Sequence, residues 1–468
     1  MTNTETTTTM PQRTLRGWLR RLHDTGRLAS ARPGVALEHE LAAIAKRLDG
    51  TKAVIFPGPG GHVMPVVSGL VSSRVWIAEA MGTPPSQMLG RFLRAAENPL
   101  PCREISGAVA QQQRHDDVDI RRLLPVPKHS EHDSAPYITA GLVIARNPAT
   151  GRQNVSINRI QIDSPKRMAM LILPRHLHAF VQMAEERGEA LPVAVVIGVD
   201  PLTLLASQAV VPVDHDELEI AGALHGAPLD VVKCLSSEVR VPANAEIVIE
   251  GRILNGVREP EGPFGEFPKY YSPRDRREVI EIDCVTHRHN PLYHTIIPAE
   301  MEHLLLGAIP REATILAHLK RSFTDVLDLH LSTGGVCRYH LYVQIRKRNE
   351  GQPKNVICAA FGAHYDIKHV VVVDEDVDVH DPVQVEWAVA TRFQADRDLV
   401  RIDGALGSIL DPSSDNGVSA KLGFDATRPL SYEEHRFTRV RIPGEEAVDL
   451  ERVLQPLAAS AVKSMLDG

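Results

Sequence analysis

The feature that most constrains the fold is a series of short β-rich runs in the middle of the chain. The runs expected to be strands are Tyr137–Ala145, Asn154–Ile162, Ala194–Val199, Ile247–Ile253 and Val279–Arg288. They are β-branched or alternate between apolar and polar residues, and turn residues separate them, which is typical of strands. Helical patterns interrupt the series at Pro174–Glu186 and Pro201–Ala206. We therefore predict a mixed β-barrel or sheet with inserted helices at the centre of the chain.

The regions on either side predict α/β domains, because helical and strand-like patterns alternate in them. The N-terminal helices are expected at Leu15–Leu28, Glu38–Leu48, Val75–Ala80 and Pro85–Arg94, and the strands at Ala53–Phe56 and His62–Val67. A helix from Met301 leads to predicted strands at Tyr339–Lys347, Asn355–Phe361 and His369–Val373 and a helix at Pro382–Arg392. A length of 468 residues fits two or three domains, which we place at 1–115, 116–315 and 316–468.

The last segment, Glu445–Met465, is amphipathic, although Pro456 is expected to kink or restart a helix there. Such an apolar terminal helix packs either on its own domain or on a partner subunit.

Composition narrows the classes of function. The net charge of −7 gives no global attraction to nucleic acid or anionic membranes, so local cations must attract an anionic substrate. The longest apolar runs, such as Met168–Leu173, are far shorter than a membrane-spanning helix requires. The five cysteines form no CxxC pair, and the N-terminus lacks the features of a signal peptide. We expect a cytoplasmic protein.

Two carboxylates flank a tight loop in Glu261-Gly-Pro-Phe-Gly-Glu266. Gly262, Pro263 and Gly265 favour a turn over a helix. Such a turn can direct both carboxylates into one cavity, where they cannot both ionise cheaply, and one then becomes a proton donor near neutral pH. A surface turn with solvated glutamates fits the same residues.

The run Asn154-Val-Ser-Ile-Asn-Arg159 is unusually polar for a strand. Val155 and Ile157 share one face, whereas Ile160 and Ile162 have the opposite parity, so the apolar phase switches near Asn158. A bulge or strand end there would let Asn154 and Arg159 face one site. An edge strand with a wet face is the alternative.

Metal ligands have no compact motif in this chain. His176 and His178 begin a helix, and Glu217 and Glu219 precede an apolar run. Asn, His and Glu together form a mixed oxygen and nitrogen site that suits Mn²⁺. The chain carries no GxGxxG, Walker, GxSxG or HExxH motif, so dinucleotide-fold, serine-hydrolase and metalloprotease functions are disfavoured.

Several segments, in order along nearly the whole chain, carry a resemblance to one family. They are Leu15–Leu28, Asn154–Arg159, Pro174–Leu177, Glu217 with Ala221–Leu224, Val241–Ile247, Glu250-Gly251, Glu261–Glu266, Val373–Asp378 and Lys421–Thr427. The chain resembles the UbiD-type decarboxylases, which use prenylated FMN. The resemblance implies an N-terminal α/β domain, a central split β-barrel that binds flavin and a C-terminal α/β domain that makes a homodimer, sometimes within a hexamer.

The resemblance also implies roles for individual residues. The catalytic network matches Arg159, Glu261 and Glu266, and the ligands of a divalent metal, commonly Mn²⁺, match Asn154, His176 and Glu217. K⁺ lies nearby, along the segment Ala206–Ala209. Cofactor contacts match Ile157, Arg175, Ser207 and Gln208, although the family often has Gln where Arg175 stands. A lysine that approaches the cofactor phosphate is either Lys421 or Lys368.

The implied reaction is reversible loss of CO₂ from an aromatic, heteroaromatic or α,β-unsaturated acid. We hypothesise that Glu266 delivers the proton, while Glu261 and Arg159 orient the acid. His303 and Arg311 lie eight residues apart, which resembles the furan-dicarboxylate branch, where a His and an Arg meet the second ring substituent. Arg311 in a salt bridge on the connecting helix is the alternative.

We therefore expect a five-membered heteroaromatic acid as the substrate, and a flavin prenyltransferase as the supplier of the cofactor. Polyprenyl-hydroxybenzoate, phenazine and acrylic-type acids stay open, as does a flavin-binding partner without turnover. A carboxylase running in the reverse direction is also open, because sequence cannot fix the direction.

Overall fold

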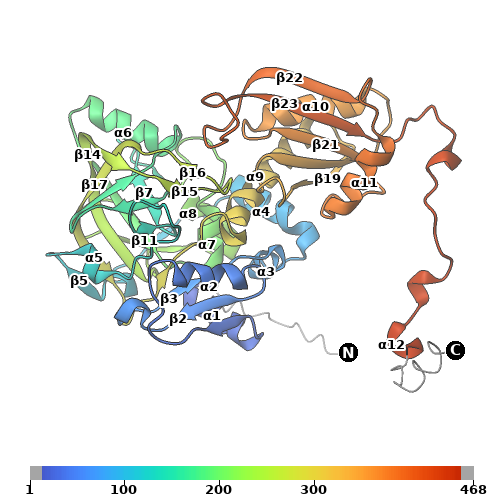
Figure 1. Ribbon diagram of the computed structural model, residues 1–468. Coiled ribbons are helices and arrows are strands. Elements are labelled where there is room, and N and C mark those ends of the chain that lie inside the picture. Colours follow the sequence, from blue (N-terminus) through green and yellow to red (C-terminus); the bar gives the residue numbers. More distant parts are fainter. Residues whose placement is uncertain (1–12, 455–468) are drawn as a thin grey trace, which may run out of the picture. The chain divides into compact units, whose positions relative to one another are not determined.

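The structure of the chain is a computed structural model that describes residues 13–454. The chain forms two compact units (Figure 1). The first contains the residues up to Lys347 together with Gly351–Thr427, and the second contains Arg348–Glu350 and the residues from Arg428 onward. The first unit carries every candidate site residue. The division at residues 115 and 315 stays a prediction.

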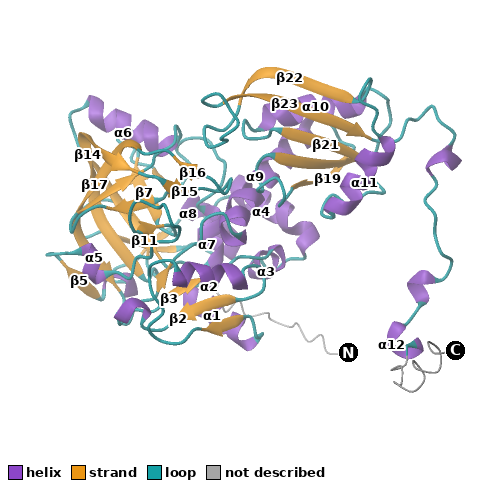
Figure 2. Cartoon of the chain, in the orientation of Figure 1, coloured by secondary structure: helices purple, strands orange, loops and turns teal. Residues whose placement is uncertain are grey.

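The predicted central sheet is confirmed, and it is a curled, open sheet. In the described residues it has nine strands in the order β6-β9-β10-β17-β14-β11-β7-β8, with β5 paired to β17. Figure 2 shows the long strands β14 and β17 near β7 and β11. The strands are β5 Gln113–His115, β6 Tyr137–Ile138, β7 Leu142–Arg146, β8 Gln153–Ile157, β9 Ile160–Ile162, β10 Arg167–Met170, β11 Leu191–Ile197, β14 Ile247–Glu261 and β17 Asp275–His287. β14 and β17 are the longest, and β14 ends on Glu261, so the sheet itself positions that carboxylate.

Helices and two small sheets accompany this sheet. The helices are α5 Ile120–Leu123, α6 His176–Glu186, α7 Pro201–Ala206 and α8 Glu217–His225. A three-stranded sheet contains β4 Arg103–Glu104, β12 Asp230–Lys233 and β13 Arg240–Pro242, and a hairpin contains β15 Phe264–Gly265 and β16 Tyr271–Ser272. The first turns of α7 and α8 are capped by Asp200 and Asp216, whose carboxylates accept backbone N–H bonds.

The N-terminal region is α/β, as predicted. Its four-stranded sheet contains β1 Leu28–Ser30, β2 Ala53–Phe56, β3 Val66–Ser68 and, from later in the chain, β18 Tyr293–His294. Its helices are α1 Leu15–Asp24, α2 Glu40–Leu48, α3 Arg74–Ala80 and α4 Met88–Glu97. The strand predicted at His62–Val67 is only partly correct, because extended pairing begins at Val66.

The C-terminal sheet has the order β19-β20-β21-β23-β22 in the described chain. Its strands are β19 Val326–Leu331, β20 His340–Ile345, β21 His369–Asp374, β22 Leu399–Leu406 and β23 Val418–Ala426. Its helices are α10 Gln352–Ala363 and α11 Pro382–Arg392. The strand predicted at Asn355–Phe361 is wrong, because these residues lie inside α10. Val356, Ile357, Ala360 and Phe361 are buried at the spacing of one helical face.

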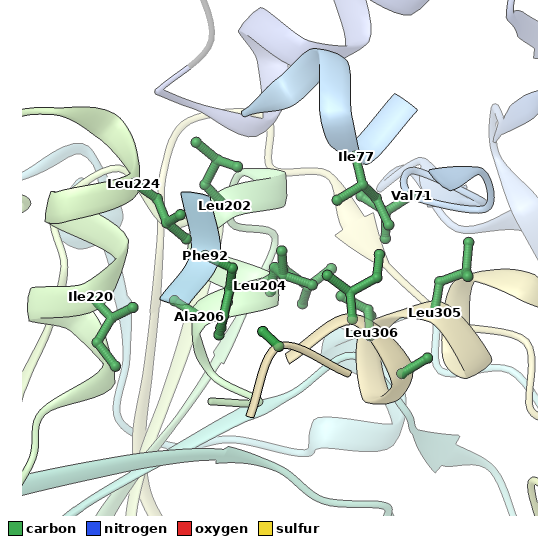
Figure 3. Close-up of a cluster of buried hydrophobic side chains, with 14 of the residues drawn as sticks. Val71, Ile77, Phe92, Leu202, Leu204, Ala206, Ile220, Leu224, Leu305 and Leu306 are labelled. Atoms are coloured by element: carbon green, nitrogen blue, oxygen red, sulfur yellow. The ribbon is translucent and has the colours of Figure 1, made fainter. Parts of the chain in front are cut away.

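A helical core lies behind the site. Figure 3 shows side chains of α3, α4, α7, α8 and α9 (Met301–Ser322) gathered in one apolar cluster, which includes Phe92, Leu204 and Leu306. Helix α9 packs into this core, and four of its residues, His303, Leu306, Gly307 and Arg311, also line a cavity. Within residues 13–454, none of the helices combines the length and apolarity that a membrane crossing needs.

The described residues cover only part of the predicted terminal helix, Glu445–Met465. In the described residues, helical turns occur at Glu445–Ala447 and in α12, Leu450–Val453. A continuous helix is therefore not formed over residues 445–454. Its remainder, with Pro456, lies outside the described residues.

His129 predicts how stability depends on pH. It is buried, with Nε2 2.8 Å from Thr295 Oγ1, and burial lowers its pKa from 6.5 to about 3. The folded protein therefore binds fewer protons than the unfolded chain between these two pKa values. The contribution of His129 to the free energy of unfolding is complete above pH 6.5 and is lost as the pH falls toward 3. We expect His129→Asn to flatten the fall in unfolding free energy by about 1.4 kcal/mol per pH unit in that window. Urea unfolding from pH 7 to 4 checks this, and an unchanged slope contradicts it.

Candidate functional site

Arg159 joins the two loop carboxylates into one buried network. Its Nε donates to Glu261 Oε1 at 2.9 Å and its Nη2 to Glu261 Oε2 at 2.8 Å, while Nη1 donates to Glu266 Oε1. Burial by itself lowers the pKa of Arg159, but the attraction of Glu266 and the hydrogen bonds that Arg159 donates to Glu261 outweigh it, so the pKa is raised. The two glutamates of the loop are thus buried and share one counter-ion, Arg159. The alternative of a surface turn with solvated glutamates is excluded.

Local geometry explains why this loop turns inward. Gly262 has φ of +87°, and a Cβ there would lie 2.9 Å from the carbonyl oxygen of Pro273, so only glycine fits. The Gly262 amide donates to Gln161 Oε1 at 3.0 Å, and Tyr137 Oη donates to Glu261 Oε1 at 3.2 Å. These contacts fix Glu261 at the end of β14.

The two carboxylates differ in their access to the cavity. Glu261 is fully buried and is not part of the cavity wall, whereas Glu266 is 8% exposed and lines the cavity beside Arg159. Of these two carboxylates, only Glu266 can therefore exchange a proton with a molecule bound in the cavity. Glu261 instead balances the charge of Arg159.

The strand break predicted near Asn158 is confirmed. β8 ends at Ile157 and β9 begins at Ile160. Asn154 and Arg159, of opposite parity, consequently line the same cavity.

The three candidate metal ligands also line this cavity. Asn154 Nδ2 donates to Glu217 Oε1 at 2.8 Å, and the Val155 amide donates to Glu217 Oε2 at 2.7 Å. Burial raises the pKa of Glu217 to about 8 and lowers that of His176 at the start of α6. Carboxylate and amide oxygens with one imidazole are a donor set that fits a divalent cation, which would replace the proton on Glu217. No cluster of three His, Cys, Asp or Glu side chains occurs within residues 13–454, so this mixed set is the candidate there.

The cavity has a volume of about 790 Å³, which falls within the range of cofactor sites. Ile157, Arg175, Ser207 and Gln208, predicted as cofactor contacts, all line it. Its apolar wall includes Leu171, Ile172, Leu173, Phe264, Phe267 and Ile296. Apolar residues, four arginines and the carboxyl groups of Glu217, Glu266 and Asp366 together line a cavity that suits a flat anionic cofactor and a small acid.

Neither candidate lysine lines the cavity. Lys421 Nζ donates to the carbonyls of Tyr365 and Ile367 at 2.8 and 2.6 Å, and Lys368 Nζ donates to Asp411 and Ser413. Lys421 therefore holds the backbone beneath Tyr365, which does line the cavity. Direct contact between Lys421 and a cofactor phosphate stays a prediction that this geometry does not support.

His303 and Arg311, predicted to meet the substrate, line the cavity from α9. The Ala299 amide donates to His303 Nδ1 at 3.1 Å. Burial lowers the pKa of His303 to about 3, so the ring is neutral and its one proton lies on Nε2. Arg311 Nε donates to His364 Nε2 at 3.1 Å, and its Nη2 lies 3.6 Å from Asp366. Arg311 thus lines the cavity and also forms a salt bridge, as the alternative interpretation proposed.

The sequence did not predict the part of the wall that comes from the turn before β20 and from the connection between α10 and β21. Arg338, His364 and Asp366 line the same cavity. Arg338 follows a Gly-Gly-Val-Cys turn, and this turn is the sequence feature that could have indicated Arg338 as a site residue. Its burial depends on long-range packing that the local pattern does not report.

Three family models together match most of the chain. They describe the N-terminal, Rift-related and C-terminal domains of 3-octaprenyl-4-hydroxybenzoate carboxy-lyase (UbiD), and they match residues 19–96, 103–301 and 304–426. Anhydromevalonate phosphate decarboxylase of Methanothermobacter thermautotrophicus is 43% identical over 378 residues, 81% of this chain and 88% of that protein.

Two solved structures of the UbiD-class enzyme HmfF from Pelotomaculum thermopropionicum are similar over 94% of this chain and 100% of theirs. The complex with FMN has 49% identity and a TM-score of 0.93. The evolved dimeric form in complex with prenylated FMN has 46% identity and a TM-score of 0.89.

Proposed function

This chain belongs to the UbiD family of carboxy-lyases, and on that premise we propose that it decarboxylates, reversibly, a five-membered heteroaromatic acid of the furan or pyrrole type with prenylated FMN as its cofactor. One observation carries the proposal. The buried Arg159–Glu261–Glu266 network presents a single acid, Glu266, to a cavity large enough for a flavin and a small ring. The relative that binds prenylated FMN supports the choice of cofactor.

Bound prenylated FMN would supply the electron sink that makes loss of CO₂ feasible. The protein supplies position and a proton. Arg159 holds Glu266 at the cavity wall and orients the acid, and Glu266 donates its proton to the carbon that has lost CO₂. Glu261 keeps Arg159 in place through a bidentate pair. The apolar residues of the wall exclude water from this carbon.

Asn154, His176 and Glu217 would hold a divalent cation, Mn²⁺, beside the cofactor phosphate, with K⁺ near Ala206–Ala209. The donor set and the burial of Glu217, which raises its pKa, support this assignment. We expect His176→Ala to lower bound manganese to less than about a tenth of the wild-type content, because losing one of three ligands removes a strong bond. Elemental mass spectrometry of the purified protein measures the metal directly.

His178 offers the matched control for the metal experiment. It lies two residues further along α6 and does not line the cavity. His178→Ala should retain manganese. Equal metal content in the two variants would remove His176 from the metal site.

A phosphorylated acid is the second candidate substrate. The relative named for anhydromevalonate phosphate and the arginines in the cavity wall favour it. Polyprenyl-hydroxybenzoate, phenazine and acrylic-type acids have no such specific support in the wall.

The proposal is tested by co-expressing the chain with a flavin prenyltransferase. The purified holoenzyme is characterised by its flavin spectrum and then incubated with furan, pyrrole, hydroxybenzoate, acrylic and phosphorylated acids. CO₂ release from the furan or pyrrole acids, absent without the prenyltransferase, is the expected result. A flavin-loaded protein that releases CO₂ from none of them would instead be a flavin-binding partner without turnover.

A further inference from the structure

A buried chain of hydrogen bonds leads from His129 to the wall of the main cavity. His129 Nε2 lies 2.8 Å from Thr295 Oγ1, and Thr295 Oγ1 lies 3.0 Å from Thr139 Oγ1. The Ile296 amide donates to Thr139 Oγ1 at 3.0 Å. Thr295 is fully buried and His129 nearly so, whereas Thr139 lines the cavity. Of these three side chains, only Thr139 can therefore contact a bound molecule.

The number of hydrogens in this chain exceeds the number of contacts. Burial lowers the pKa of His129 to about 3, so its neutral ring carries one N–H, and each threonine carries one O–H. Apart from the Ile296 amide, the three side chains make no further hydrogen bond within residues 13–454. Three hydrogens thus share two contacts, and one hydrogen has no partner inside the protein.

This unpaired hydrogen has its lowest cost on Thr139. His129 Nδ1 is buried without a hydrogen-bond partner, so a proton on it would be an orphaned donor. The hydroxyl of Thr295 would be orphaned in the same way if it turned away from the chain, because no water reaches it. The chain therefore runs from His129 Nε2–H through the hydroxyl of Thr295 to Thr139 Oγ1. The O–H of Thr139 is then free to donate into the cavity.

The sheet places this donor beside the catalytic network. In the antiparallel pairing of β6 and β9, Ile138 lies opposite Ile160. The same register, continued by one residue, places Thr139 opposite Arg159, and both side chains line the cavity. The Nε, Nη1 and Nη2 of Arg159 are engaged by the two glutamates of the loop. A ligand that meets Glu266 can therefore accept a hydrogen bond from Thr139.

We infer that the hydroxyl of Thr139 binds the carboxylate that leaves as CO₂, and that Thr295 and His129 are positioning residues that fix the direction of its hydrogen. The inference rests on the proposed function, which places the carbon that is protonated, and hence the carboxylate that it loses, beside Glu266. A neutral hydroxyl holds this carboxylate in place. It stabilises the negative charge less than a cation would, so it opposes the loss of CO₂ less.

The test is a calorimetric titration of the protein loaded with metal and FMN, with furan, pyrrole, hydroxybenzoate, acrylic and phosphorylated acids as ligands. FMN lacks the prenyl group of the proposed cofactor, so we expect no turnover and an equilibrium Kd. For the acid that the wild type binds most tightly, Thr139→Val should raise the Kd about 10- to 100-fold, because it removes a hydrogen bond to a charged group. Thr139→Ser keeps the hydroxyl and should restore the Kd to within about threefold of the wild type.

Two controls separate binding of the carboxylate from packing. Thr139→Val should change the Kd of FMN for the metal-loaded protein by less than about twofold, because the lost hydroxyl binds the acid and not the cofactor. Thr427→Val removes another buried hydroxyl, which donates to Asp425 outside the cavity. This variant should leave the Kd of the acid unchanged.

Nuclear magnetic resonance of protein with ¹⁵N-labelled histidine tests the direction of the chain without any ligand. We expect the ring of His129 to be neutral at pH 7, with its hydrogen on Nε2 and a bare Nδ1. The signals of His129 are identified by their absence from the spectrum of His129→Asn. A residue that only fills space has no reason to prefer this tautomer.

Four outcomes overturn the inference. They are a wild type that binds none of the acids, an unchanged Kd of the acid in Thr139→Val, an equal loss of FMN from that variant, which would give the hydroxyl to the cofactor, and a proton on His129 Nδ1. Because binding is measured without turnover, the proposed function fails separately. A protein that binds an acid through Thr139, but releases no CO₂ when it carries prenylated FMN, retains the binding site and loses the reaction.

Discussion

Replacing Glu266 by Gln is expected to reduce CO₂ release by about 10²- to 10⁴-fold while flavin stays bound, because general acid catalysis contributes an effect of that size. The amide keeps the shape of the side chain and an oxygen that can accept from Arg159 Nη1. It has no proton of suitable acidity for the carbon that has lost CO₂. Initial rates of CO₂ release, normalised to the flavin content of each preparation, measure the effect.

Glu259→Gln is the matched control for this substitution. Glu259 lies on β14, two residues before Glu261, and pairs with Arg167 outside the cavity. Its loss should leave the rate within about twofold, because surface pairs contribute little. Activity of Glu266→Gln close to that of Glu259→Gln would contradict the assignment of Glu266 as proton donor.

Arg159→Met is expected to lower the free energy of unfolding by about 3–5 kcal/mol, because it leaves two buried carboxylates without their counter-ion. Glu261 is fully buried and Glu266 is nearly so, and water cannot replace the three donors that Arg159 contributes. Decarboxylation should fail as well, since Glu266 loses its support. Urea unfolding of the metal-loaded, flavin-bound protein measures the stability.

The double variant Arg159→Met/Glu261→Gln separates charge from packing. It should recover part of the lost stability without recovering activity, because it removes one of the two unpaired charges. Arg167→Met, which breaks an exposed pair with Glu259, should cost no more than about 1 kcal/mol. If Arg159→Met costs as little as Arg167→Met, the network is not a buried charge cluster.

The part of the site that follows from local pattern was predictable from the sequence. The change of apolar phase between Ile157 and Ile160 identified a strand break, and that break brings Asn154 and Arg159 to one cavity. The alternation along Ile247–Ile253 identified β14, although the strand continues to Glu261. The sequence pattern indicates strands and strand breaks because they depend on residues two positions apart.

The remainder depends on contacts that are distant in sequence. A Gly-Pro turn has the same composition whether it is solvated or buried, and the partner that decides, Arg159, lies 102 residues before Glu261. Arg338 reaches the cavity from the C-terminal sheet for the same reason. The β-branched residues Val356 and Ile357 favoured a strand, whereas the structure has a helix there. Ala360 and Phe361 continue the buried face of that helix, α10.

The central claim is that this cavity removes CO₂ from an acid reversibly and that Glu266 then protonates the carbon. The most direct measurement is mass spectrometry after the holoenzyme is incubated with furan-2,5-dicarboxylate and ¹³C-bicarbonate in D₂O. For the wild type we expect ¹³C in the carboxylate of the remaining acid and one deuterium in the product. For Glu266→Gln we expect ¹³C exchange without deuterated product. Deuterated product formed by Glu266→Gln at the wild-type rate, or no exchange by the wild type with any acid that the cavity binds, would contradict the account.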